Sequence, residues 1–206
     1  MKISEAGFRD LYHRFVVIEI DEWQRETLDI FPGFKEANCV LAYGYFDSSA
    51  GISFEVLEVG KKSTNGLVFS GGRDDVSYKF RFDAVEDHQF TCQDETNLLR
   101  EKHNHKIESI HRFYAADDGV EQSRSMTILD GFRYEQCPDD VLVILLKKDV
   151  NPEKCWITIT GMEGKHFRGK LLNEPFADFG VHNGDVVEFD IGKDQSGKTL
   201  LYSLLN

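Results

Sequence analysis

Residues 153–172 read EKCWITITGMEGKHFRGKLL, and the two strand-like runs in this stretch decide the fold of the C-terminal part. The runs cover residues 155–160 and 167–172, and the segment between them contains glycine, as in a hairpin. Two further runs, 186–191 and 199–204, follow at short intervals. Four short strands joined by glycine-containing turns predict a small curled sheet or barrel.

Upstream of this stretch, the hydrophobic pattern predicts antiparallel strands. Residues 39–46 read as a buried strand, and residues 52–56 alternate as in a half-exposed one. Residues 78–83 alternate aromatic and charged side chains, which is typical of a strand over a core. We expect a meander, because parallel neighbours would need crossover connections of about a dozen residues or more. Residues 141–146, apolar on both faces, predict a central strand.

Helical spacing marks three segments. Phe8, Leu11, Tyr12 and Phe15 recur on one face of a predicted helix, with Ser4 as its N-cap. A shorter helix is expected over residues 23–31.

A longer surface helix is expected over residues 94–114, with Asp94 or Thr96 as its cap. Residues 115–125 read as a polar loop, and residues 125–129 as a strand.

The fold class that follows is α+β: an antiparallel β meander with covering helices, plus a C-terminal small β-barrel-like module. Pro152 and its neighbours form the expected boundary. This divides the chain into an N-terminal α+β domain (1–150) and a small β module (151–206), with one continuous domain as the alternative.

Charge narrows the classes of partner. The chain carries a net charge of -12, which argues against nucleic-acid binding because phosphates require an excess of Lys and Arg. Residues 151–206 hold 6 Lys and Arg against 8 Asp and Glu, which leaves 18 against 28 for residues 1–150. An acidic surface favours a protein partner with a basic surface. The acidic pairs Asp74, Asp75 and Asp117, Asp118 fall in predicted loops and are the candidate partner-binding residues.

The distribution of apolar residues along the chain predicts where in the cell the protein resides. No apolar run approaches the length of about 20 residues that spans a bilayer, so no membrane association is expected. Glu5 and Asp10 interrupt the segment where a secretion signal would be apolar, and we expect a cytoplasmic protein.

Three motifs near the C-terminus resemble a known family. They are EKCWITI (153–159), FRGKLLNEP (167–175) and GDVVEF (184–189). Together they resemble the bacterial domain-of-unknown-function family numbered 2314, whose members show a Glu-x-x-Trp-Val start, a Gly-x-Leu-x-Asn-x-Pro corner and a Gly-Asp-x-Val-x-Phe strand. The chain departs from that pattern after the last strand, where Asp194 is not followed by tryptophan. The resemblance covers about 60 residues and implies a small bacterial β module, but it implies no established activity and no established catalytic residue.

The corner of this motif has two interpretations. Asn and Pro are turn formers, and the residue before a proline is extended, so an architectural role is favoured. The alternative is a ligand pocket between the meander and the C-terminal module. Its candidate ligand-binding residues are Trp156, Asn173, Glu174 and His182.

Histidine spacing gives little support for a metal. His103, His105 and His111, with His88, form the one concentration of histidines, but no pair has the i, i+4 spacing with which a helix presents two imidazoles. We expect a solvated helix face and no metal. If the segment were extended, His103 and His105 would share a face and the metal hypothesis would return.

Cysteine spacing is that of structural thiols. Cys39, Cys92, Cys137 and Cys155 form no Cys-x-x-Cys pair, so buried thiols are expected. A Cys92–His88 thiolate pair would also need an orienting group and an oxyanion site, and neither is visible in the sequence.

One predicted strand is cationic. His166, Arg168 and Lys170 share a face of it, and Glu188 and Asp190 share a face of the strand over residues 186–191. If the two strands are neighbours, cross-strand charge pairs explain the pattern better than an anion-binding patch.

The function favoured by these observations is a non-enzymatic binding protein of immunity or regulatory type that masks a cationic partner. The alternative is a small-molecule-binding domain or enzyme. No cofactor is expected, and the sequence leaves the oligomeric state open.

Overall fold

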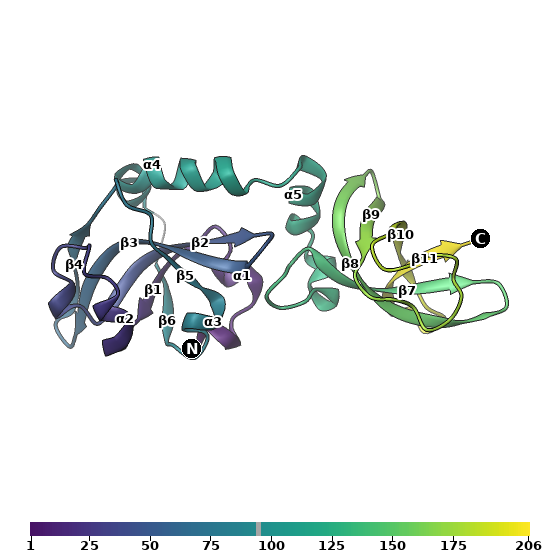
Figure 1. Cartoon of the computed structure of the whole chain (residues 1–206), viewed down its shortest axis with the longest axis horizontal. Coiled ribbons are helices and arrows are strands. Elements are labelled where there is room, and N and C mark those ends of the chain that lie inside the picture. The colour runs from purple at the N-terminus through teal and green to yellow at the C-terminus, as the bar shows by residue number, and fades with distance from the viewer. Residues whose placement is uncertain (94–95) are drawn as a thin grey trace. The chain divides into compact units, whose positions relative to one another are not determined.

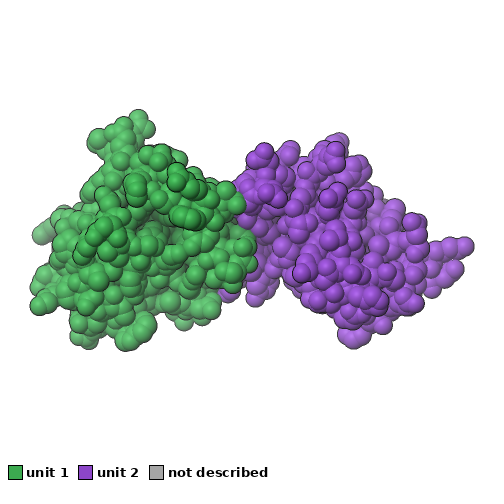
Figure 2. Space-filling model, turned by 45° about the horizontal axis from the view of Figure 1, so that its top comes forward, with its two compact units in different colours: residues 1–115 green, residues 116–206 purple. Residues whose placement is uncertain are grey.

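The structure, a computed structural model, describes residues 1–93 and 96–206, and the chain divides into two compact units, 1–115 and 116–206 (Figure 2). The division precedes the boundary predicted at Pro152. Strands β7 (Asp140–Lys147) and β8 (Val150–Glu163) form an antiparallel hairpin across that position. Because backbone hydrogen bonds join the two strands, both belong to the second unit.

The first unit is built on a six-stranded antiparallel sheet with strand order β4-β3-β2-β1-β6, in which β5 also pairs with β3. This confirms the predicted antiparallel α+β architecture. The strands are β1 (Phe15–Glu19), β2 (Cys39–Asp47), β3 (Gly51–Ser63), β4 (Gly66–Gly72), β5 (Lys79–Arg81) and β6 (Phe90–Gln93).

Helix α4 (Asn97–Tyr114) lies across one face of this sheet (Figure 1). Ile107 and Ile110 on its inner side pack in one core with Tyr43 and Leu57 of β2 and β3. The hydroxyl of Thr96 caps the helix by accepting from the Leu99 backbone N–H at 3.2 Å. Asp94, the other predicted cap, lies outside the described residues.

Every residue of β2 is buried, and so are residues 51–60 of β3. The prediction of a half-exposed strand over residues 52–56 is therefore wrong. Alternating sequence patterns expose one face only where no element covers it, and here both faces are covered.

The predicted helix over residues 8–15 is wrong in its second half. Helix α1 ends early (Phe8–Leu11), His13 adopts a left-handed conformation (φ 55°), and Phe15 begins β1 opposite Tyr43. The β-branched residues that follow Phe15 favour a strand, and pairing with β2 outweighs the helical spacing.

The remaining helices of this unit are short: η1 (Ile3–Glu5), α2 (Glu22–Glu26), η2 (Phe34–Glu36) and α3 (Phe82–Val85). Because α3 begins at Phe82, the strand predicted over residues 78–83 is reduced to the three residues of β5.

The second unit is a closed five-stranded barrel, as the sequence predicted. Its order is β10-β11-β7-β8-β9, with β9 (His166–Leu171), β10 (Val186–Lys193) and β11 (Thr199–Leu205). All neighbours are antiparallel except β11 and β7. Along β9, buried Phe167, Gly169 and Leu171 alternate with exposed residues, as expected for a barrel wall.

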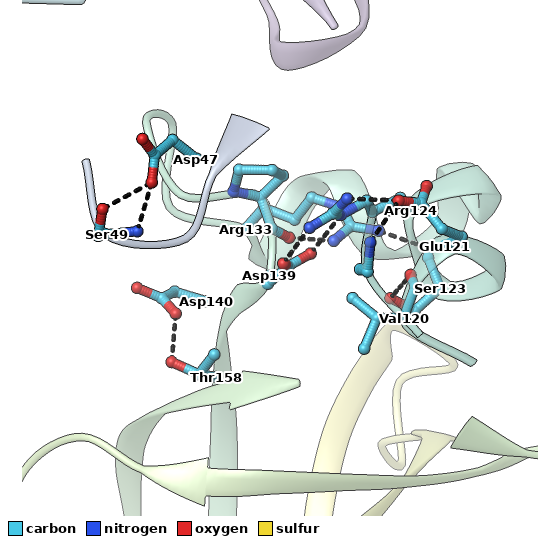
Figure 3. Close-up of polar contacts among 12 residues, drawn as sticks. Asp47, Ser49, Val120, Glu121, Ser123, Arg124, Arg133, Asp139, Asp140 and Thr158 are labelled. Atoms are coloured by element: carbon cyan, nitrogen blue, oxygen red, sulfur yellow. Dashed lines mark hydrogen bonds and ion pairs between the residues drawn. The ribbon is translucent and has the colours of Figure 1, made fainter. Parts of the chain in front are cut away.

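Two helical elements precede the barrel where the sequence predicted a loop and a strand. They are α5 (Asp118–Ser125) and η3 (Thr127–Phe132), and Leu129 of η3 is buried in the barrel core. Helix α5 contains few apolar residues, and a buried ion pair holds it against the barrel. The buried Arg124 guanidinium donates to both carboxylate oxygens of Asp139, at 2.9 and 2.6 Å (Figure 3).

Candidate functional site

A layer of charged groups lies buried between β3 and α4 in the first unit. Glu55 and Glu58 of β3 are 3% and 2% exposed, and His103 and Lys106 of α4 are 3% and 6% exposed. Burying charged groups costs free energy unless they are paired, and such groups concentrate at functional sites. This layer is therefore the first candidate site.

A β-bulge explains why both carboxylates reach the same helix. Residues three apart in a regular strand point to opposite faces of a sheet. In the pairing of β2 with β3, however, the register shifts, and Leu57 is an extra residue. One extra residue redirects the side chains that follow it, so Glu58 faces α4 as Glu55 does.

Glu55 and Lys106 form the first couple of this layer. The Lys106 ammonium lies 3.6 Å from Glu55 Oε1 and donates to the Val56 carbonyl at 3.0 Å. Glu55 also accepts from the Ser77 hydroxyl at 2.9 Å and from the Tyr78 N–H at 3.3 Å. Burial raises the pKa of Glu55 and lowers the pKa of Lys106. Each group therefore stabilises the charged form of the other, and the Ser77 hydroxyl and the Tyr78 N–H also stabilise the Glu55 carboxylate.

Glu58, Lys102 and His103 form the second group of this layer. Glu58 Oε1 accepts from Lys102 Nζ at 2.7 Å and lies 3.0 Å from His103 Nε2. Burial alone would raise the pKa of Glu58, but hydrogen bonds from His103 and Lys102 hold that pKa below its usual value. His103 is thus a buried partner of a carboxylate, and the expectation of a solvated helix face is wrong for this residue.

Next to the first couple, a cavity of about 350 Å³ opens between α4 and the segment that precedes β5. We call it the α4 cleft. Glu55 and Lys106 are its buried charged residues, while Ile110, Phe113 and Tyr114 supply apolar and aromatic surface from α4. The cleft combines apolar and aromatic surface with a few polar groups, as small-molecule sites do.

Further charges line the α4 cleft. Asp74 and Asp75, two of the predicted partner-binding residues, are both exposed there. Asp75 is hydrogen-bonded to Arg73, and this bond lowers the pKa of its carboxyl. Lys79 donates to the Tyr114 hydroxyl at 2.6 Å, which fixes its ammonium at the cleft wall. The other predicted acids, Asp117 and Asp118, are exposed at the start of α5 in the second unit.

The histidines of the predicted concentration make different contacts from one another. His105 lines the α4 cleft, and His88 lies 3.8 Å from Asp21. His111 Nε2 lies 3.0 Å from the Tyr43 hydroxyl, and its ring is 4.5 Å from that of His13, centroid to centroid. Among the described residues, no three His, Cys, Asp or Glu side chains are placed to hold a metal ion.

The predicted ligand-binding residues of the C-terminal corner all make contacts within the second unit. Asn173 Oδ1 accepts from the Trp156 N–H at 2.7 Å. The Glu174 carboxylate accepts from the Asn183 N–H at 2.8 Å and lies 2.7 Å from His182 Nδ1. These contacts fix the β9–β10 connection, which supports the architectural interpretation. A pocket between the meander and the C-terminal module stays a prediction.

The cationic strand β9 pairs with the strand that carries Glu188 and Asp190. Strands β9 and β10 are neighbours in which Arg168 faces Glu188, and His166 Nδ1 lies 2.7 Å from Asp190, so the charge-pair interpretation is confirmed.

Cys92 is exposed, because it lies on the edge strand β6. The expectation of a buried thiol is wrong for that residue. Burial raises the pKa of the Cys39 thiol to about 11.

The sequence analysis missed Glu55, Glu58 and Lys106. One signal was available: residues 52–59 read ISFEVLEV, in which two carboxylates interrupt an otherwise apolar strand. An isolated charge within a buried run indicates a paired group, and the partner then lies on another element.

Comparison with known proteins does not identify the site. No family model matches the chain, and neither the curated proteins nor the solved structures contain a match. The resemblance of the last 60 or so residues to family 2314 stays a prediction. In the described part of the chain, no helix has the length and apolar character needed to cross a bilayer.

Proposed function

We propose that the first unit binds a small amphipathic zwitterion, an apolar amino acid or a close analogue, in the α4 cleft. The observation that carries the proposal is the buried Glu55–Lys106 couple beside the apolar wall of this cleft. A binding role is proposed rather than catalysis, because each of these two groups is already committed to the other.

Volume supports a small ligand. The cavity of about 350 Å³ lies at the lower end of the range of about 300 to 1,000 Å³ for small-molecule sites. Ile110 is 6% exposed and Phe113 is 79% exposed, so a ligand beside them would cover aromatic surface that is now solvated. Covering apolar surface contributes about 25 cal/mol per Å² before the costs of association are subtracted.

Charge supports a zwitterion. Glu55 and Lys106 neutralise each other, which leaves Asp74, Asp75 and Lys79 among the cleft residues to interact with a ligand, although Asp75 also pairs with Arg73. Lys79 uses one of its three ammonium donors on Tyr114, so further donors are available for a carboxylate. A ligand ammonium would face Asp74 and Asp75, and its carboxylate would face Lys79.

Calorimetry with three probes of one shape tests this proposal. L-Phenylalanine carries both charged groups, phenethylamine lacks the carboxylate, and 3-phenylpropionate lacks the ammonium. We expect phenylalanine to bind about tenfold more tightly than either analogue, because each analogue leaves one protein charge without its partner. Equal affinity for phenylalanine and phenethylamine would contradict the proposed role of Lys79.

Variants of two cleft residues test whether the probes bind in the α4 cleft. Lys79→Met should remove the preference for phenylalanine over phenethylamine, and Asp74→Asn should weaken both ammonium-bearing probes. The matched control is Lys61→Met, since Lys61 pairs with Glu36 at 3.0 Å and does not line the cleft. Unchanged affinities in Lys79→Met and Asp74→Asn would place the ligand elsewhere.

A second candidate is the masking of a cationic protein in the manner of an immunity protein. It is supported by the exposure of all four acids predicted to contact a partner, Asp74, Asp75, Asp117 and Asp118. Co-expression with the products of neighbouring genes should retain a basic protein, and reversing these four charges should release it. Retention of the same protein by the charge-reversed chain would contradict this candidate.

A further inference from the structure

We infer that the second unit carries a separate binding site for an amphipathic carboxylate, on the outside of the barrel over β7, β8 and β11. A cavity of about 260 Å³ marks it. Its lining includes the apolar residues Phe132, Leu142, Ile144 and Leu200 and the cations Lys154 and Lys198. We call it the seam groove. It is independent of the α4 cleft, because all of its residues belong to the second unit.

The groove lies where two strands of the barrel part. Parallel pairing of β11 with β7 begins only at Tyr202, opposite Ile144. Before that point, residues 199–201 pair with β10 and not with β7. The first half of β7 pairs with β8, and Val141 also bridges to Arg133. The barrel is thus closed through the second half of the β7–β11 seam, and the cavity is lined by residues from the first half.

The floor of the seam groove is apolar although it lies outside the barrel. Val141, Val143 and Leu145 are buried in the barrel core, so the alternating residues Leu142 and Ile144 point outward. Outward-facing positions of a small barrel are usually polar. Phe132 at the end of η3 adds an aromatic side chain from another element. Apolar surface of this kind is typical of a binding groove.

The charges at the seam groove select an anion. Lys154, the cross-strand partner of Ile144, and Lys198 are both exposed, and neither forms an ion pair with a described carboxylate. Asp194 also lines the groove and attracts Lys198 weakly. Its Oδ1 atom is occupied by its own turn, where it accepts from the N–H groups of Ser196 and Lys198 at 2.8 and 2.9 Å.

Two cations above an apolar floor fit a molecule with a carboxylate head and one apolar arm. Two lysines that pair with no described carboxylate are unexpected at one groove, because the chain carries a net charge of -12, with 24 Lys and Arg against 36 Asp and Glu. A volume of about 260 Å³ accommodates a medium-length aliphatic acid and not a folded partner. The apolar arm would lie on Leu142, Ile144 and Leu200, and the carboxylate would lie between Lys154 and Lys198.

Titration of the ¹⁵N-labelled whole chain with octanoate tests this inference. We expect saturable shifts of the amide signals of Leu142, Ile144 and Leu200. Octylammonium, which has the same arm and the opposite charge, should give shifts that do not saturate. The Lys154→Gln/Lys198→Gln variant should bind octanoate about fivefold more weakly, as expected for two exposed charge contacts. Lys165→Gln, a lysine that does not line the groove, is the matched control and should leave the affinity unchanged.

A second variant tests the apolar arm without changing a charge. Leu142→Ser should weaken octanoate binding while the spectrum keeps the dispersed signals of a folded barrel. The inference is overturned if octanoate gives no saturable shifts, or if octylammonium binds at these residues with equal affinity. It is also overturned if the double lysine variant binds as the wild type does.

Discussion

Lys106 and Glu55 form a buried ion pair, so the removal of either side chain should destabilise the first unit. We predict that Lys106→Met lowers the free energy of unfolding of the first unit by about 3 to 5 kcal/mol, because it leaves an uncompensated carboxylate in the interior. The Glu55→Gln/Lys106→Met double variant should recover part of this loss. A urea titration of the whole chain, followed through the amide signals of β2 and β3, measures both effects.

The control for that prediction is an exposed ion pair in the same unit. Lys61 is 57% exposed at its contact with Glu36, so Lys61→Met should leave the urea midpoint nearly unchanged. If Lys106→Met and Lys61→Met gave the same midpoint, the Glu55–Lys106 couple would have no special role in stability.

Glu58 should make the stability of the first unit depend on pH. Its pKa in the folded protein is lowered from the ordinary value of 4.5. Its ionised form therefore contributes stability that is fully present above pH 4.5 and is lost as the pH falls through the lowered pKa. We predict that wild type exceeds Glu58→Gln in unfolding free energy at pH 7 and that the difference shrinks toward pH 3. A difference that stays constant over this range would mean that Glu58 does not titrate with folding.

At the scale of single residues, the sequence predicts the chemistry of exposed groups better than that of buried ones. Asp74 and Asp75 are exposed acids, as their neighbours in the sequence indicate. Glu55 looks like an outward-facing residue of an alternating strand, and strict alternation would place Glu58 on the opposite, apolar face. Their true environment depends on a helix about 50 residues away, and no local pattern contains that information.

Helix α5 depends on close contact between its backbone and the barrel. A Cβ atom added at Gly119 would lie 2.6 Å from the backbone nitrogen of Met162 in β8. We predict that Gly119→Ala displaces α5 and destabilises the second unit by about 1 to 3 kcal/mol, the usual cost of overpacking. Thermal unfolding followed by circular dichroism measures the change.

Gly131 provides the control for α5. It also belongs to a helical element, η3, but a Cβ atom there would meet nothing within 4 Å. Gly131→Ala should therefore be close to neutral. Because alanine has a higher helix propensity than glycine, propensity cannot explain a loss of stability. A loss as large as that of Gly119→Ala would therefore show that the contact with Met162 is not the reason for the effect at Gly119.

Among the elements, strands with strict alternation could be predicted, and elements fixed by distant partners could not. Strands β9, β10 and β11 lie close to their predicted ranges because apolar residues alternate along them. Helix α5 has little apolar periodicity, since its buried residues are Val120, Ser123 and Arg124. Its stability rests on the Arg124–Asp139 ion pair, which joins segments 15 residues apart.

At the scale of the whole molecule, each unit has a core of its own. The core under α4 is formed by residues 15–110, and the barrel core by residues 129–201. We predict that residues 1–115 and 116–206, expressed separately, fold independently and keep the amide chemical shifts that they show in the full chain. A spectrum with collapsed dispersion for either fragment would show that its core needs the other unit.

The fold class could be predicted because it depends on the period of the hydrophobic pattern, which strands of both units carry. The boundary between the units could not be predicted in the same way. Proline punctuates the sequence at Pro152, but in the structure that residue lies within β8. The actual division follows helix α4, where residues 115–125 read as a polar loop but contain no proline.

The extra residue at Leu57 makes the first unit sensitive to chain length as well as to side chains. If a single codon were deleted there, β3 would return to regular alternation, and Glu58 would follow Glu55 by two residues, on the same face as before and still opposite Leu41. A conservative replacement of Leu57 would keep both carboxylates under the helix. A deletion at this position should therefore destabilise the first unit through the loss of the buried Leu57 side chain and not through the loss of the Glu58 contacts, and it should cost more than a conservative exchange of Leu57.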